Sequence, residues 1–83
     1  MEITFYQSAL CPRCRMAGMA LREIQKEYGD LVIREIEVMA QPHAALKAGI
    51  RMIPALTAGD RKLAGFILTR QKIREFVATL YRL

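Results

Sequence analysis

The stretch that decides the fold is residues 3–14, which read ITFYQSALCPRC. Its first four residues form an apolar extended run typical of a β-strand, and a helical pattern begins at Arg13. Cys11 and Cys14 therefore stand where a strand ends and a helix begins. A helix N-terminus presents unpaired N–H groups and about half a positive charge, so a thiolate is stabilised there and its pKa falls. Because these are the only two cysteines in the chain, we interpret them as a redox-active dithiol.

The length of 83 residues predicts one domain, residues 1–83, and the hydrophobic content of 53% is enough for a buried core. A disulfide across two intervening residues would stabilise such a fold only slightly, so the cysteine pair is not a structural staple. The chain does not start with a basic segment followed by an apolar one, and no apolar run reaches the ~18 residues that span a bilayer. These features favour a cytoplasmic protein that binds no membrane, and we expect it to be a monomer.

The formal net charge of +5 comes from 13 Lys and Arg residues against 8 Asp and Glu residues. The basic residues are spread along the chain without a run of like charges. They also lack the interleaving with aromatic residues that is typical of nucleic-acid-binding surfaces. We therefore expect solvated helix faces that favour an acidic partner, and no binding of nucleic acid.

Hydrophobic periodicity and turn residues divide the chain into seven elements. The predicted strands span residues 3–6, 31–38, 53–58 and 62–67, and the predicted helices span residues 12–28, 42–48 and 70–81. Pro42 and Gly49 bound the short helix, Gly59 and Asp60 form a hairpin turn, and Thr69 caps the last helix. The first strand, helix and strand must form a right-handed parallel crossover. The order β-α-β-α-β-β-α therefore predicts a four-stranded mixed sheet flanked by three helices.

Two motifs connect this α/β order to a known group of proteins. They are Cys-Pro-x-Cys after the first strand and Ile53-Pro54 at the start of the third. With them, the chain resembles a small thioredoxin or glutaredoxin of the thioredoxin-fold superfamily, over essentially its whole length. The resemblance implies the thioredoxin fold. It also implies a cis proline at Pro54 opposite the cysteine pair, with the backbone of Ile53 offered to the substrate.

The spacing of the two cysteines suits thiol–disulfide exchange. Cys11, in front of the helix, is expected to be the exposed nucleophile. Cys14, one turn further along, is expected to be the more buried thiol that resolves the mixed disulfide. Pro12 shapes the turn, and the positive charge of Arg13 favours the thiolate. We therefore predict a thiol-disulfide oxidoreductase that needs no bound cofactor.

Several positions depart from what the resemblance implies. Leu10 stands where thioredoxins have Trp, and Phe5 stands where they have a buried Asp that is assigned to proton handling. Ser8 replaces the Lys that is common in glutaredoxins. Of their glycine-rich glutathione site, the chain retains Gly65. The glutathione signature is therefore weak.

These departures favour protein disulfides as the substrates, bound through an exposed apolar surface. The residues expected to bind substrate are Leu10, Ile53, Pro54, Gly65 and Phe66. A thioredoxin-reductase-like flavoprotein is the expected reductant, and glutathione, in a glutaredoxin-type reaction, is the alternative.

A different class of function stays open, because thiolates are also preferred ligands of soft metals and metalloids. The dithiol is half of a tetrahedral zinc site, but the chain adds only His43 and scattered carboxylates as further ligands. His43 is expected on the surface, and methionines such as Met16 and Met19 are expected to fill gaps in packing. We therefore expect no metal site, and a metal-binding dithiol module is the alternative to the enzyme.

Overall fold

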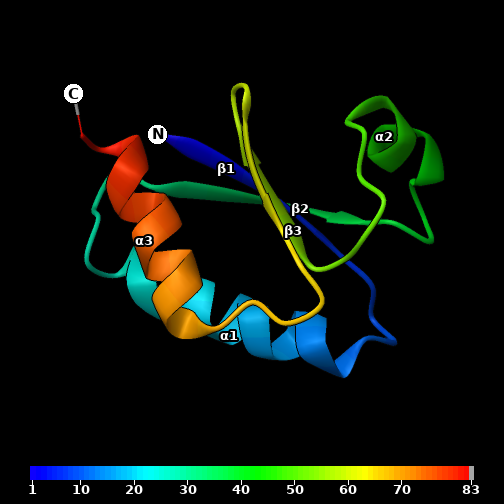
Figure 1. Cartoon of the computed structure of the whole chain (residues 1–83), viewed down its shortest axis with the longest axis horizontal. Coiled ribbons are helices and arrows are strands. Elements are labelled where there is room, and N and C mark those ends of the chain that lie inside the picture. Colours follow the sequence, from blue (N-terminus) through cyan, green and yellow to red (C-terminus); the bar gives the residue numbers. More distant parts are fainter. Residues whose placement is uncertain (83) are drawn as a thin grey trace.

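A computed structural model describes residues 1–82 of the chain. Its elements are β1 (Glu2–Gln7), α1 (Pro12–Gln25), β2 (Val32–Glu37), α2 (Pro42–Lys47), β3 (Ala55–Ala58), β4 (Arg61–Ala64) and α3 (Arg70–Leu80). Figure 1 shows their arrangement. The predicted order β-α-β-α-β-β-α is confirmed. No helix within residues 1–82 is both long enough and apolar enough to cross a membrane.

The four strands form one mixed sheet in the order β2-β1-β3-β4. β1 pairs with β2 in parallel and with β3 in the antiparallel direction, and β3 and β4 form an antiparallel hairpin. The predicted four-stranded mixed sheet and the thioredoxin fold are thus confirmed. β1 is a central strand that is paired on both sides, and the chain passes directly from it into the segment with the two cysteines.

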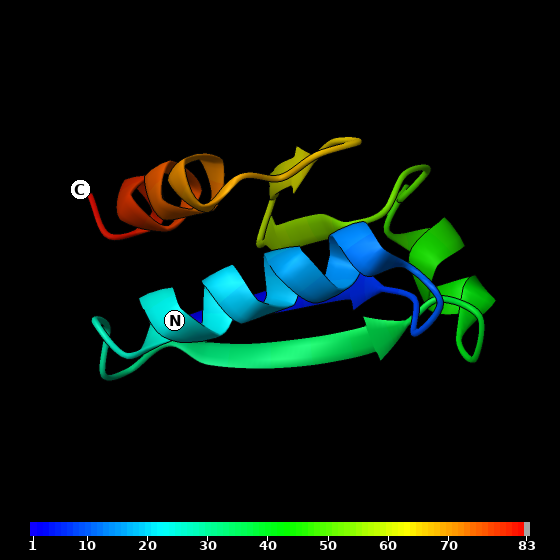
Figure 2. The ribbon, with the colours of Figure 1, turned by 90° about the horizontal axis from the view of Figure 1, so that it is seen from below.

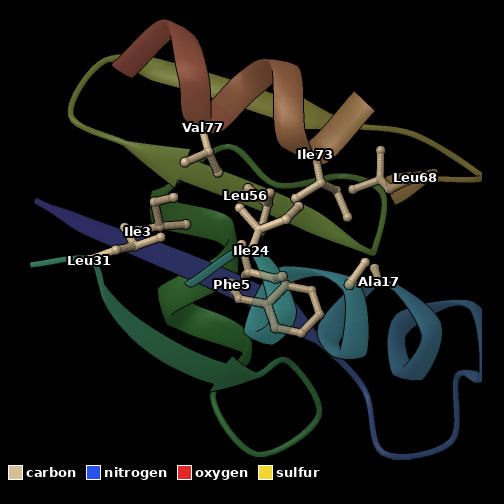
Figure 3. Packing of buried hydrophobic residues seen from close by; sticks show 11 residues of the cluster. Ile3, Phe5, Ala17, Ile24, Leu31, Leu56, Leu68, Ile73 and Val77 are labelled. Carbon is tan, nitrogen blue, oxygen red and sulfur yellow. The ribbon is translucent and has the colours of Figure 1, made fainter. Parts of the chain in front are cut away.

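The two faces of the sheet bury different side chains because successive residues of a strand point to opposite faces. Ile3, Phe5 and Leu56 lie in the larger core cluster together with residues of α1 and α3. Figure 3 shows Phe5 and Leu56 packed between these helices. Tyr6 and Ala55 lie in a smaller cluster with residues of α2 and its flanking loops. Figure 2 shows α2 set apart from the other two helices.

Several predicted boundaries are wrong by one to three residues. β3 begins at Ala55 instead of residue 53, because Pro54 has no N–H to give to the strand ladder. β4 ends at Ala64, and residues 65–69 leave the sheet to reach α3. α1 ends at Gln25, and residues 26–28 continue with tighter hydrogen bonds to carbonyls three residues back. β2 spans residues 32–37 and is one residue shorter at each end than predicted.

Candidate active site

Cys11 is the N-cap of α1 and has an extended backbone, with φ −109° and ψ 106°. Its Sγ accepts a hydrogen bond from the backbone N–H of Cys14 at 3.2 Å. A Ser, Thr, Asp or Asn oxygen usually takes this place and satisfies one of the free N–H groups of the first turn. Pro12 follows within the first turn, where its missing N–H costs nothing. The start of the helix therefore points a hydrogen-bond donor at the sulfur of Cys11.

The two thiols are unbridged and differ in exposure. Cys11 is partly exposed, whereas Cys14 is 1% exposed. Cys14 is buried because it lies on the face of α1 that also buries Ala17 and Leu21. The pair therefore consists of one accessible sulfur and one sulfur covered by the protein.

The electrostatic surroundings of Cys11 favour its thiolate. Burial acts to raise the pKa of Cys11, and hydrogen bonds from the side chain and backbone of Cys14 act to lower it. The positive charge of Arg13 and a hydrogen bond from its side chain act in the same lowering direction. The pKa of Cys11 is consequently held below its ordinary value of 9.0.

Cys14 has the opposite preference. Burial is the main cause that raises its pKa from 9.0 to about 11, and the hydrogen bond and charge of Cys11 add to the effect. A backbone hydrogen bond from Ser8 and the charge of Arg13 oppose this rise without reversing it. The pair is therefore polarised, because Cys11 gives up its proton more readily than an ordinary thiol and Cys14 holds its proton more tightly.

Arg13 joins the first turn of α1 to the segment between β4 and α3. Its guanidinium carbon lies 3.8 Å from the centre of the Phe66 ring, a cation–π arrangement. The Nε atom of Arg13 is buried and has no hydrogen-bond partner among the described residues. The structure thus brings together two predicted site residues that are far apart in the sequence.

The other predicted site residues differ in how far they are exposed. Leu10 and Phe66 are 87% and 62% exposed, so they present apolar surface next to the cysteine segment. Pro54 is fully buried, and the Ile53–Pro54 peptide bond is cis, as the resemblance implies. Ile53 is half-buried and packs against the cluster on the α2 side of the sheet. Gly65 lies against Leu68, whose Cδ2 would be 3.3 Å from an added Cβ.

The placement of Pro54 follows from the strand register. Tyr6 pairs with Ala55, so Pro54 comes immediately before the pairing, at the end of the sheet where β1 runs into residues 8–11. This is the end of the sheet that carries the cysteine segment. The side chain of Ile53, in contrast, lines a separate hollow with Val38 and Ile50.

Glu37 is a residue of this region that the sequence reasoning missed. Its carboxylate accepts backbone hydrogen bonds from Ala9 at 2.9 Å, Met39 at 2.5 Å and Ala40 at 3.1 Å. These bonds, the one from Ala9 above all, hold the pKa of Glu37 below its ordinary value of 4.5. Glu37 thereby ties the segment before Cys11 to the loop before α2. The sequence signal that could have indicated this role was an acidic residue at the end of the second predicted strand, which runs parallel to β1.

The described residues contain no group of three or more His, Cys, Asp or Glu side chains close enough to hold a metal ion. His43 lies exposed in α2, as predicted. Met16 and Met19 are 72% and 59% exposed, so the prediction that they fill gaps in the packing is wrong. They lie on the outer face of α1, away from the face that buries Cys14.

Comparison with known proteins agrees with this geometry, although no protein-family model matches the chain. It is 32% identical over 56 residues to a probable thioredoxin of Methanothermobacter thermautotrophicus, a match that covers 66% of each chain. It is 32% identical over 66 residues to a thioredoxin of Methanocaldococcus jannaschii, which covers 77% of this chain and 78% of the relative.

Solved structures show the same fold. A mutant thioredoxin from Halobacterium salinarum superposes with a TM-score of 0.82 at 16% identity, over 99% of this chain and 75% of that one. The fold, the paired cysteines and the two thioredoxin relatives lead to one conclusion. The chain belongs to the thioredoxin family of thiol-disulfide oxidoreductases.

Proposed function

We propose that this protein reduces disulfides in other proteins through its Cys11-Pro12-Arg13-Cys14 dithiol. The observation that carries the proposal is the asymmetry of the two thiols. Cys11 is accessible and has a lowered pKa, whereas Cys14 is buried and has a pKa raised to about 11. The attacking thiol of such a pair needs access and thiolate character, and the resolving thiol needs neither until the mixed disulfide has formed.

The reaction proceeds in two exchanges. The Cys11 thiolate attacks one sulfur of the substrate disulfide, that bond breaks, and the other sulfur leaves with the electron pair. Cys14 then loses its proton and attacks the Cys11 sulfur, which displaces the second substrate thiolate. The substrate gains two electrons, the protein ends as a Cys11–Cys14 disulfide, and no bound cofactor takes part.

The surface around Cys11 supports a polypeptide substrate. Leu10, directly before Cys11, and Phe66 offer exposed apolar side chains, and Arg13 lies against the Phe66 ring. Ser8, at the position of the glutaredoxin Lys, is buried, and its Oγ accepts the N–H of Leu10 at 3.3 Å. No cation is therefore offered there to a glutathione carboxylate.

A reductant must return the disulfide to the dithiol, and we propose a thioredoxin-reductase-like flavoprotein in the cytoplasm. Glutathione is less favoured, because Thr69 already uses its hydroxyl oxygen to cap α3 through the N–H of Lys72 at 3.1 Å. The N–H of Lys72 is then already used at the helix end where a glutathione carboxylate would otherwise be held.

Two cysteine variants test the attack and resolution roles. Cys11→Ser is expected to abolish reduction of insulin disulfides. Cys14→Ser is expected to accumulate a mixed disulfide that reducing agents release, because attack still occurs and resolution does not. Preferential alkylation of Cys14 at neutral pH would reverse the two roles.

The reductant is tested by mixing the oxidised protein separately with glutathione and with a thioredoxin reductase and its nicotinamide cofactor. Rapid reduction by glutathione alone would replace the flavoprotein assignment by a glutaredoxin-type reaction. A stoichiometric metal or metalloid retained through purification, together with no disulfide reduction, would favour the metal-binding module instead.

A further inference from the structure

Cys14 poses a proton-transfer problem that the neighbouring residues of β1 do not solve. The resolving step needs the Cys14 thiolate, yet the thiol is 1% exposed and its pKa is raised to about 11. Phe5, in the adjoining strand β1, is an aromatic residue that accepts no proton. A group that takes the proton therefore has to reach Cys14 from another element.

A cavity of about 230 Å³ connects Cys14 with one such group. Its lining includes Cys11, Cys14, Gly18, Arg22 and Glu35, so it extends from the cysteine pair along α1 to β2. A cavity of this size with polar walls has room for several water molecules. Glu35 supplies the only carboxylate among the described residues that line it.

The placement of Glu35 follows from the sheet. It pairs in register with Phe5, so both side chains lie on the face of the sheet that α1 covers. Its Oε2 accepts a hydrogen bond from Arg22 of α1 at 2.6 Å, and 40% of its side chain is exposed. Glu35 is thus held at the outer end of the cavity, with Cys14 at the inner end.

Gly18 leaves room for this arrangement. A Cβ at this position would come within 3.1 Å of the Phe5 ring and 3.3 Å of Arg22 Nη1. Both distances are shorter than an ordinary van der Waals contact. A residue with a side chain at this position would therefore require the Phe5 ring or the Arg22 guanidinium, both on the cavity wall, to shift.

We propose that Glu35 accepts the proton of Cys14 through water in this cavity during the resolving step. The Cys14 S–H bond breaks, the proton passes through water to the Glu35 carboxylate, and the electron pair stays on sulfur. The thiolate then forms the bond to Cys11 while the bond from Cys11 to the substrate sulfur breaks. The departing substrate thiolate takes a proton from solvent, and Glu35 returns its proton to solvent through its exposed side.

The inference rests on the proposed function and on the charges around the cavity. Arg15 and Arg22 of α1 face it, as do the two cysteines, and β2 contributes Glu35. Besides Cys11, the residues of β1 and of the following loop that line it carry no ionisable side chain. Among these groups, the Glu35 carboxylate is the one that can take the proton from Cys14 and return it to solvent.

The test separates the two exchanges with the full-length reduced protein and dithiobis(nitrobenzoate), a symmetric aromatic disulfide. Each exchange releases one coloured thiolate, so attack by Cys11 and resolution by Cys14 appear as successive phases. In Glu35→Gln, the first phase is expected to keep its rate. The second is expected to slow about tenfold or more near neutral pH, because general-base assistance contributes at least that much. Its rate should then rise more steeply with pH than in the wild type, because hydroxide has to take the proton.

Two further variants distinguish proton transfer from a structural role of the ion pair. Arg22→Gln breaks the same pair but keeps the carboxylate, so its second phase should not slow. Glu27→Gln is the matched control, because Glu27 accepts from Arg74 at the same distance of 2.6 Å and lies outside the cavity.

A second phase in Glu35→Gln equal to that of the wild type, or an equal slowing in Arg22→Gln, would overturn the assignment of Glu35 and leave the proposed function intact. A wild type that shows no first phase would overturn both.

Discussion

The guanidinium of Arg13 lies over the ring of Phe66, 3.8 Å from the guanidinium carbon to the ring centre. Arg13 is in the first turn of α1, and Phe66 is in the segment between β4 and α3. The contact fixes a cation two residues after Cys11 and at the same time holds an exposed aromatic ring beside the cysteines. One pair of side chains thereby links the charge that acts on the thiol to the surface that we propose binds the substrate.

Removal of this cation is expected to raise the pKa of Cys11. In Arg13→Ala the thiolate loses both the charge and the hydrogen bond of Arg13, which lower the pKa in the wild type. The rise should be modest, because solvent and salt screen the charge and the N–H groups of the helix start stay in place. The rate of alkylation of Cys11 as a function of pH measures it. Lys72→Ala removes an exposed charge from α3 and should leave the profile unchanged, whereas a lower pKa in Arg13→Ala would contradict the role of the cation.

Phe66 is expected to matter for large substrates only. Phe66→Leu keeps an apolar side chain but removes the ring, so the stacked contact, worth about 0.5–1 kcal/mol at an exposed site, is lost. Reduction of insulin should show a KM raised several-fold, while the rate with a small symmetric disulfide should hardly change. Ile67→Leu is the control, because Ile67 is about equally exposed and the ring of Phe66 is kept. Equal effects on the large and the small disulfide would argue against a docking surface for polypeptide.

Much of this site could be predicted from the sequence, because its elements follow local rules. The apolar run of β1, Pro12 in the first turn of α1 and Thr69 as an N-cap each act within a few residues. The segment after β4 could not be predicted in the same way. Lys62 to Ile67 read as one strand, but the chain leaves the sheet after Ala64.

The contacts between residues far apart in the chain could not be predicted from the sequence either. The Arg13–Phe66 stack and the bond from Ala9 N–H to Glu37 join residues that are at least 28 positions apart, and they depend on how the elements pack. Local periodicity contains no information on such pairs. The same limit applies to the burial of methionines, since it depends on which face of α1 the sheet covers.

Glu37 is expected to order the segment before Cys11. Glu37→Ala removes the acceptor of three backbone N–H groups, so the N–H of Ala9 should exchange with solvent faster than in the wild type. Because the folded state lowers the pKa of Glu37, the stabilisation is present above the ordinary value of 4.5 and is lost as pH falls through the lower folded value. Hydrogen exchange monitored by NMR at Ala9 measures the effect. Glu75→Ala, on α3, should leave the exchange rate of this N–H unchanged. An unaltered rate in Glu37→Ala would contradict the proposal that Glu37 orders this segment.

The raised pKa of Cys14 has a consequence for stability at alkaline pH. The folded protein keeps this thiol protonated up to about pH 11, whereas the unfolded chain releases the proton near the ordinary value of 9.0. The stabilisation is therefore complete below the ordinary value and is lost as pH rises through the folded value. The difference corresponds to about 2–3 kcal/mol in the free energy of unfolding.

The measurement compares Cys11→Ser with the double variant Cys11→Ser/Cys14→Ala, because Cys11→Ser prevents a disulfide and removes the opposing titration of Cys11. Burial is the largest cause of the raised pKa and is still present in Cys11→Ser. Denaturant unfolding at increasing pH should show that Cys11→Ser loses more stability than the double variant between pH 9.0 and about 11. Parallel curves for the two proteins would mean that Cys14 titrates alike in the folded and unfolded states, and that burial does not hold its proton.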